Sequence, residues 1–339
     1  MSSRAEEARS YYSEDVSMDS HSFLEMLLLD SCFIFHAFRL IICPLLYSGW
    51  PSDQIMLDLL MLENQIPFFV LVQLYCGLGG EQEFRKFAGA YAGTIIHYAV
   101  NSFTRCNMGS TWDDSILPEQ VLQLLHLFRL SLGPCGIKST LPPQRMNDFM
   151  GPSPRYVPSV TELQDRSAIE FHTRYSHSIL DIRFHSGVMK IPFLELNDGN
   201  ITILRNLIAF EQCCPQVEPG VTSYAAFIDC LIKTEDDANL LERSGILLNS
   251  LPTSSDAAFF FSKLSPRAEV RKSTYLDHIL VDVNRYHNSK WNRWIRWYAD
   301  LKLNYFSSPW LSLLMVAAAV LLILSFTQIC YSVISYYHW

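Results

Sequence analysis

The residues between Leu311 and Ile329 restrict this chain more than any other part of its sequence. They form a run of 19 residues, LSLLMVAAAVLLILSFTQI, that carries no charge. A helix needs about 20 predominantly apolar residues to cross roughly 30 Å of hydrocarbon, because lipid offers its backbone no hydrogen bonds. Aromatic residues lie on both sides of the run, as they do at headgroup depth. The sequence therefore predicts one transmembrane helix at about residues 310–333, followed by a short tail at 334–339.

The basic residues around this helix predict its orientation. Only His338 follows the helix, whereas four basic residues precede it: Lys290, Arg293, Arg296 and Lys302. Cytoplasmic segments beside membrane helices are enriched in Lys and Arg, so the N-terminal part is expected in the cytosol, with the plasma membrane one candidate. The tripeptide Asn200-Ile201-Thr202 is a glycosylation sequon, which would favour the opposite topology if this region were lumenal.

Residues 290–309 form an aromatic and basic segment in front of the predicted membrane helix. Four of its residues recur at helical spacing and form an apolar stripe: Trp291, Trp294, Ile295 and Tyr298. The basic residues of the segment lie off this stripe. Such a stripe either packs on the protein's own core or lies on the membrane surface.

The composition of the remainder indicates a folded protein. Apolar residues make up 49% of 339, and Asp plus Glu outnumber Lys plus Arg by 34 to 26. The apolar residues are enough to form a core. The excess of acidic residues leaves no overall basic field that could bind nucleic acid, which we exclude as a partner. The nine cysteines form no CxxC pair and are expected to be mostly buried and reduced. Residues 1–20 are polar, and the stretch from Phe23 is expected to be a buried core helix rather than a secretory signal.

Residues 21–132 are predicted to be a helical region. Asp53 can cap a helix from about Gln54 to Glu63, and Pro67 suits the first turn of the next helix. The polar trio Glu63-Asn64-Gln65 lies between these helices. We expect its side chains to cap helix ends, with a polar binding site as the alternative.

A Pro- and Gly-rich segment at 133–160 is predicted to be a linker or long loop before a second region at 161–289. There, SILDIRF and VMKIPFLEL flank His185-Ser186-Gly187 and predict a hairpin with one buried face. Residues 197–200 predict a second turn. Further helices follow, and their expected boundary residues are Thr222 or Ser223 as a cap, Gly245 as an end and Asp256 as a cap. Together with 21–132, this region is expected to form one composite domain. The predicted fold class is mainly α-helical with a small β-hairpin or sheet element (α+β), plus the membrane helix.

Recognisable catalytic chemistry is absent from the sequence. It has no GxSxG elbow, Gly-rich phosphate loop, HExxH or zinc-spaced Cys/His set, so we assign no catalytic, cofactor-binding or metal-binding residues and predict that it is not an enzyme. The alternative is an enzyme that uses Asp181 with His177 or His185. These residues lie near His172 and Arg174 in a polar stretch that also suits an exposed hairpin.

Several segments, in this order, give the chain a recognisable resemblance. They are MLLLDSCFIFHAF, IMLDLLMLENQIPFFVLVQLY, SILDIRFHSGVMKIPFLEL, LRNLIAFEQC, TSYAAFIDCLI and the hydrophobic tail. Over roughly residues 22–335 they resemble the plant family called "domain of unknown function 247". That resemblance implies a largely helical, membrane-anchored plant protein without an assigned activity. It also implies a link, through some grass members, to pollen recognition in self-incompatibility. Members usually begin with a further N-terminal region that includes a Gly-Pro-Phe-His-His-like stretch, which has no counterpart here.

These observations favour a single-pass membrane-anchored recognition or interaction protein. Its expected partners are the bilayer, through residues 310–333, and another protein. Besides the enzyme, a structural tether or a decayed paralogue remains as an alternative.

Overall fold

The structure is mostly helical and contains two small sheets, in agreement with the predicted α+β class. It is a computed structural model that describes residues 2–12, 16–42, 52–78, 95–97, 99–101, 103, 108, 120–133, 158–176, 178–251, 254–264, 275–288 and 309–337. Its helices and strands, in chain order, are α1 (Ser2–Arg9), α2 (Ser20–Ile42), α3 (Ser52–Leu59), η2 (Leu62–Asn64), α4 (Phe68–Leu78), α6 (Leu124–Ser131), α7 (Val160–Ser167), β1 (Glu170–Arg174), β2 (Arg183–His185), β3 (Val188–Pro192), β4 (Leu194–Leu196), α8 (Asp198–Cys213), α9 (Gly220–Leu231), α10 (Glu235–Arg243), β5 (Leu247–Asn249), α11 (Ser254–Leu264), α12 (Asp277–His287) and α14 (Pro309–Tyr337).

The polar N-terminal segment forms a helix that packs on α2. Ala5 and Ala8 of α1 are buried. The Arg9 guanidinium donates hydrogen bonds of 2.6 Å to the carbonyl oxygens of Val16 and Met18. It also lies 4.4 Å from the ring centroid of Phe23. Two buried alanines and the contacts of Arg9 thus attach this mainly polar segment to the start of α2.

Helix α2 is a core helix, as the sequence predicts for the stretch from Phe23. Its buried residues recur near helical spacing and include Phe23, Leu27, Ile34, Ala37 and Phe38. Leu28, Leu29 and Phe33 are exposed on its other side. One face therefore belongs to the protein core, while the opposite face is apolar but uncovered.

Two residues of the polar trio at 63–65 cap the end of a helix, which confirms the capping interpretation for Asn64 and Gln65. Helix α3 ends at Leu59, earlier than predicted, because side-chain amides bind its last carbonyls. The Asn64 amide donates to Asp58 O at 3.0 Å. The Gln65 amide donates to Leu59 O at 2.9 Å and Met61 O at 2.7 Å. The Gln65 amide oxygen accepts from Leu125 N at 2.9 Å, so this side chain also ties α3 to α6.

The predicted hairpin is present, and a strand that the sequence did not indicate completes its sheet. Strands β2 and β3 pair antiparallel, and the turn residues Ser186 and Gly187 have φ of 50° and 85°. Two positive φ values are what a tight two-residue hairpin requires. Strand β1 pairs parallel with β3, which gives the order β1-β3-β2. A parallel partner leaves no local turn signal, which explains why β1 was not predicted. The second sheet pairs β4 with β5.

The predicted turn at 197–200 is instead the start of α8. The Asn197 side chain accepts a hydrogen bond of 2.8 Å from Asn200 N and so caps the helix. Asn200 is buried, and its amide donates to Glu195 O at 2.8 Å. The folded protein therefore presents no accessible glycosylation site at Asn200.

The predicted boundaries of the later helices agree in part with the structure. Gly245 follows the end of α10 with φ of 68°, as predicted. Helix α11 begins at Ser254, two residues before the expected cap Asp256. The expected cap at Thr222 or Ser223 is wrong, because α9 already begins at Gly220.

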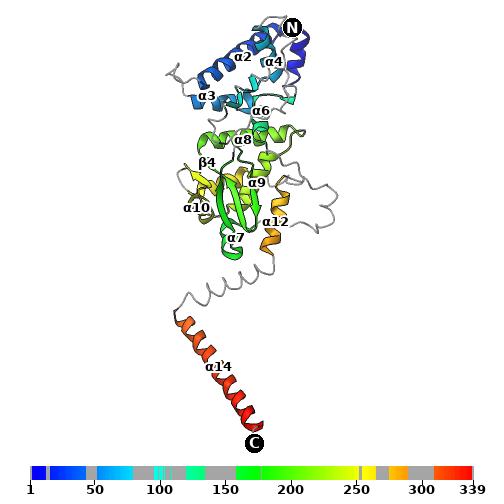
Figure 1. The fold of residues 1–339 in the computed structure, drawn as a ribbon. Helices are drawn as coiled ribbons and strands as arrows, with labels where there is room; N and C mark the ends of the chain where they lie inside the picture. The colour runs from blue at the N-terminus through cyan, green and yellow to red at the C-terminus, as the bar shows by residue number, and fades with distance from the viewer. Residues whose placement is uncertain are drawn as a thin grey trace.

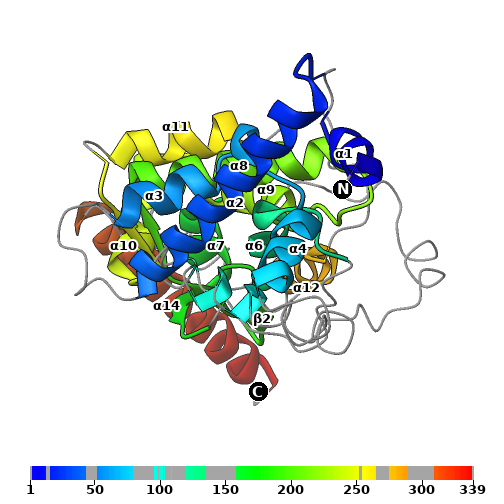
Figure 2. The same cartoon turned by 90° about the horizontal axis from the view of Figure 1, so that it is seen from above.

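Two groups of elements share one continuous core (Figures 1 and 2). Helices α2, α3 and α4 lie at one end of the body. The sheets lie at the other end with α7, α10 and α12, and α8 crosses between the two groups. The buried apolar residues of both groups, the first of them Ala8 and the last Val283, form one cluster.

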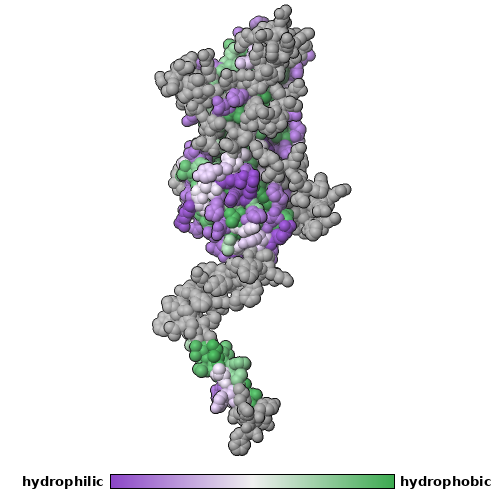
Figure 3. All heavy atoms as spheres, viewed as in Figure 1, coloured by the Kyte–Doolittle hydropathy of each residue, from purple (hydrophilic) through white to green (hydrophobic). Residues whose placement is uncertain are grey.

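Helix α14 lies apart from this body in Figure 1, and its described side chains are exposed. Figure 3 shows hydrophobic residues along it. By length and hydropathy, the described residues contain one helix that could cross a membrane, α2 over Ser20–Phe38, with 33% of it buried. The bent pair Asp53–Leu59 and Leu62–Tyr75 would qualify as a second only if it were one span, and Val320–Val333 of α14 counts as a shorter apolar helix.

Two predicted segments lie outside the described residues, namely most of the linker (134–157) and the aromatic segment before α14 (289–308). The expectation of mostly buried cysteines is wrong for the five whose exposure the structure describes. Cys32, Cys213 and Cys330 are exposed, while Cys214 and Cys230 are half-buried. Each lies on or just after a helix, where an apolar neighbour in the sequence does not imply the same face.

The buried imidazole of His126 makes the stability of the fold depend on pH. Its Nδ1 accepts a hydrogen bond of 3.2 Å from Leu122 N, and its ring lies 5.3 Å from that of Phe210. Burial, together with the charge of Arg129, lowers the pKa of His126 to about 4 from 6.5. The unfolded chain therefore binds a proton in this pH range that the folded protein does not.

We expect the free energy of unfolding to fall as the pH drops from 6.5 to about 4. The loss from His126 should be on the order of 3 kcal/mol. Urea unfolding across this range measures it, and His126→Gln should weaken the dependence. His185→Gln is the matched control, because that side chain is exposed. Identical pH profiles for His126→Gln and the unaltered protein would contradict the assignment.

Candidate functional site

An ion pair between α6 and α8 forms the polar centre of the body. The Arg129 side chain, 7% exposed, donates through Nε to the Glu211 carboxylate, which is 0% exposed. A second guanidinium nitrogen of Arg129 donates to Glu218 O at 3.0 Å. Two charges so far from water are tolerated only when each is well paired. This pair therefore fixes α6, α8 and the segment before α9 relative to one another.

The Glu211 carboxylate also caps α9, in place of the expected Thr222 or Ser223. It accepts hydrogen bonds from Val221 N at 2.9 Å, Thr222 N at 2.8 Å and Thr222 Oγ1 at 2.7 Å. These are first-turn donors that would otherwise lack partners. A Cβ on Gly220 would lie 2.1 Å from an Arg129 nitrogen, so only glycine admits the guanidinium here.

Two tyrosine hydroxyls are buried near this pair. Neither Tyr224 Oη nor Tyr275 Oη has a hydrogen-bond partner among the described residues. Burial raises the pKa of Tyr224. Burial, reinforced by Tyr224, also raises the pKa of Tyr275 well above its ordinary value. Both phenols are therefore neutral at physiological pH, and the charge at this centre is confined to Arg129 and Glu211.

A second buried carboxylate has the same structural task. Asp237, fully buried, accepts from Thr161 N at 2.9 Å and Thr161 Oγ1 at 2.7 Å, and so joins α7 to α10. It also accepts from Thr234 N at 2.9 Å in the capping box of α10. Burial raises its pKa, but the hydrogen bonds from Thr161 and Thr234 outweigh burial and lower the pKa overall. It therefore stays charged as a cap.

The candidate catalytic carboxylate, Asp181, binds arginines in the structure. Arg174 Nε lies 2.8 Å and Arg183 Nε 3.0 Å from its oxygens, and Ser176 Oγ donates at 3.1 Å. Burial alone would raise the pKa of Asp181, but hydrogen bonds from Arg183, Arg174 and Ser176 lower it. A carboxylate held in this way is a weak proton acceptor. It clamps the ends of β1 and β2 together.

The structure places the predicted histidines apart from this clamp. His185 is exposed at the end of β2, opposite Val188. His172 is exposed on β1, with its Nε2 3.2 Å from Glu170 Oε2. His177 lies outside the described residues. The enzyme alternative thus stays a prediction. Among the residues that the structure describes, no group of three or more His, Cys, Asp or Glu side chains could hold a metal ion.

One face of the β1-β3-β2 sheet is open to solvent and polar. His172, Lys190 and Arg183 lie side by side across the three strands, and all are exposed. The opposite face contributes Phe171, Met189 and Ile191 to the core, in agreement with the predicted single buried face. Tyr175, just after β1, is 99% exposed. Figure 3 shows strongly hydrophilic residues over this part of the body. We call this surface the open sheet face.

Sequence reasoning missed the Arg129–Glu211 centre. The two residues lie 82 positions apart, so no local spacing relates them. The available signal was a single charged residue inside each of two apolar helices, LLHLFRLS and LIAFEQC. A lone charge in such a setting requires a buried partner.

Fold and site together define a class of protein: a helical body with two small sheets, buried carboxylate caps and an apolar C-terminal helix. The chain belongs to the family DUF247, described as "Plant protein of unknown function", whose model matches residues 1–324. This confirms the resemblance found in the sequence.

Two Arabidopsis thaliana proteins are similar to it. "UPF0481 protein At3g47200" is 27% identical over 353 residues, which cover 97% of this chain and 71% of that protein. "Putative UPF0481 protein At3g02645" is 29% identical over 175 residues, which cover 51% of this chain and 32% of that protein. No solved structure matches the chain.

Replacement of Glu211 by Gln is expected to lower the free energy of unfolding by about 3–5 kcal/mol, because it leaves the Arg129 charge buried without its counter-ion. Urea unfolding of the full chain measures the change. Glu218→Gln is the matched control: its side chain is exposed, and Arg129 binds only its backbone oxygen. A loss below about 1 kcal/mol for Glu211→Gln would show that the pair does not organise the body.

Proposed function

We propose that this chain is a recognition protein that α14 anchors in a membrane and that binds an acidic protein through the open sheet face. The observation that carries the anchor is the uncovered apolar surface of α14. Leu321, Leu322 and Phe326 are 64%, 71% and 68% exposed on a helix of 29 residues. Water disfavours so much contiguous apolar surface, and a bilayer covers it.

The proposed topology places the body in the cytosol. The basic residues of 290–309 support this orientation. Because Asn200 is buried, glycosylation there does not report topology. Protease treatment of intact membranes does, since a cytosolic body is digested and a lumenal body is protected.

The open sheet face supports the recognition role. Lys190 lies between His172 and Arg183 in the strand register, and the fully exposed Tyr175 lies close along the chain. Arginine and tyrosine are both enriched at protein interfaces. Arg183 is paired with Asp181 and His172 lies beside Glu170, whereas Lys190 forms no ion pair with another described residue. On a chain with a formal net charge of −8, this lysine is a local positive charge. An acidic partner complements it.

Charged substitutions test which helix enters the membrane. Leu322→Lys with Phe326→Lys in α14 should move the full chain from the carbonate-resistant membrane fraction to the soluble fraction, because each central charge costs about 2.5–3.5 kcal/mol. The matched control is Leu28→Lys with Leu29→Lys on the exposed face of α2, the other apolar helix, and it should stay in the membrane fraction. Release by the α2 pair alone would refute an α14 anchor.

A photocrosslinking amino acid in place of Tyr175 tests the recognition surface. In plant membranes it should form adducts with an acidic protein, identified by mass spectrometry. Lys190→Glu should reduce the yield at least tenfold by reversing the charge at the centre of the face. Arg243→Glu, an exposed arginine on α10, is the control and should leave the yield unchanged. Equal yields for both variants would exclude the open sheet face.

A further inference from the structure

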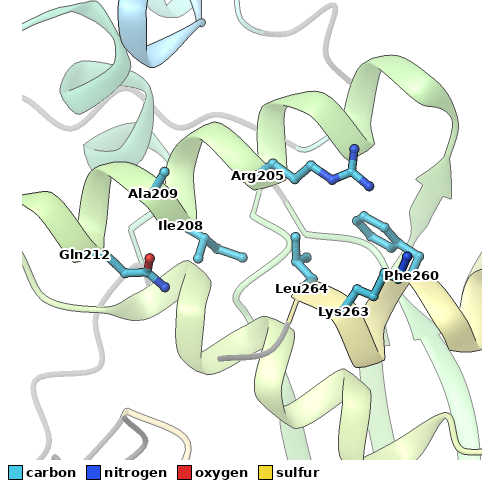
Figure 4. Close-up of a pocket in the computed structure, with 7 residues that line it drawn as sticks. All are labelled: Arg205, Ile208, Ala209, Gln212, Phe260, Lys263 and Leu264. Carbon is cyan, nitrogen blue, oxygen red and sulfur yellow. The ribbon is translucent and has the colours of Figure 1, made fainter. Parts of the chain in front are cut away.

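A pocket between α8 and α11 lies outside the surfaces described above. It has a volume of about 290 Å³ and is lined from α8 by Arg205, Ile208, Ala209 and Gln212, and from α11 by Phe260, Lys263 and Leu264 (Figure 4). Figure 2 shows α11 along one side of the body and β2 on the opposite side. The pocket is therefore separate from the open sheet face.

Two cations border this pocket without an acidic partner among the described residues. The Arg205 guanidinium lies 5.5 Å from the ring centroid of Phe260, and the Lys263 ammonium lies 4.1 Å from that of Phe259. Neither side chain forms an ion pair with another described residue, whereas Arg166, Arg174 and Arg183 all do. Like charges that border one small pocket repel each other, and a bound anion would relieve this repulsion.

The rest of the lining is apolar on one side and ends in a neutral amide. Ile208 and Phe260 are each 5% exposed, so the pocket floor belongs to the core. The ring of Phe260 also lies 5.2 Å from that of Phe261, which is fully buried. Figure 4 shows Arg205 and Lys263 around Phe260 at one end and Gln212 at the other. The floor is thus a fixed hydrophobic surface with its positive charge at one end.

We propose that this pocket binds a small organic anion with a flat apolar body. Its carboxylate would lie between Arg205 and Lys263, its apolar body would cover Ile208 and Leu264, and Gln212 would offer a hydrogen bond at the far end. Ligand pockets are usually about 300–1,000 Å³, with apolar walls and a few polar groups. The volume of about 290 Å³ lies at the lower edge of that range, which suits a small ligand. The ligand is a free molecule rather than a lipid headgroup. The inference does not depend on the anchor or on the open sheet face.

The test uses the full-length chain in nanodiscs of neutral lipid and 2-naphthoate as the probe. Isothermal titration calorimetry measures binding, with empty nanodiscs as the blank and neutral 2-naphthamide as the matched ligand. We expect saturable 2-naphthoate binding that is at least tenfold tighter than that of 2-naphthamide. Arg205→Gln and Lys263→Gln should each weaken it about tenfold, because each removes one charge-assisted contact.

Arg285→Gln on α12 is the control variant, because its side chain is exposed and α12 lies away from α11 in Figure 2. It should bind 2-naphthoate as the unaltered chain does. Thermal unfolding of each variant confirms that these exposed substitutions leave the fold intact. No saturable binding, equal affinity for the acid and the amide, or unchanged binding by Lys263→Gln would each overturn the site.

Nanodiscs that contain phosphatidic acid separate the two sources of such an anion. Unchanged 2-naphthoate affinity supports a free ligand. Competition by the anionic lipid would overturn that part of the proposal and assign the pocket to a headgroup.

Discussion

The buried pair of Arg129 and Glu211 is the interaction on which the rest of the body depends. It joins α6 to α8, and the same carboxylate supplies the cap that α9 lacks in its own sequence. Because the interior penalises an unpaired charge, replacement of either residue alone leaves its partner buried without a counter-ion. Replacement of Glu211 also removes the cap of α9. Gly220 is part of this arrangement, since a side chain there would occupy the place of the guanidinium. The hydroxyls of Tyr224 and Tyr275, which have no hydrogen-bond partner in the described part of the chain, lie in the same interior, where the neutral phenol is favoured.

Two apolar helices illustrate what hydropathy alone leaves open. Helix α2 meets the length and hydropathy criterion for a membrane span, yet Phe23, Leu27 and Ile34 on it lie in the core. The described side chains of α14 are exposed. Both helices are rich in leucine, although α2 also contains Glu25, Asp30 and Arg39, whereas α14 contains no charged residue. Packing separates them further, because a helix whose apolar face already contacts other helices has less surface to offer a bilayer. This difference supports the choice of α14 as the proposed anchor.

The polar residues of the second region divide into those that hold the fold and those that face solvent. Asp181 and Asp237 are occupied by hydrogen bonds from neighbouring elements, and their pKa values are lowered as a result. Lys190, Arg205 and Lys263 have no such partners among the described residues, and they mark the two surfaces proposed for binding. An unpaired cation on an acidic protein attracts anions, whereas a paired carboxylate in the interior mainly adds rigidity.

Local features were predictable from the sequence because local geometry decides them. The hairpin at Ser186-Gly187, the helix end at Gly245, the core helix from Phe23 and the caps from Asn64 and Gln65 each depend on a few consecutive residues. The order of the sequence motifs also indicated the family. Tertiary structure alone decided the pairing of Arg129 with Glu211, the parallel addition of β1 and the binding of Asp181 by arginines. Each of these features depends on a contact with another element of the fold. Hydrophobic burial brings such elements together, and because it is non-directional, a local sequence pattern does not reveal which elements will meet.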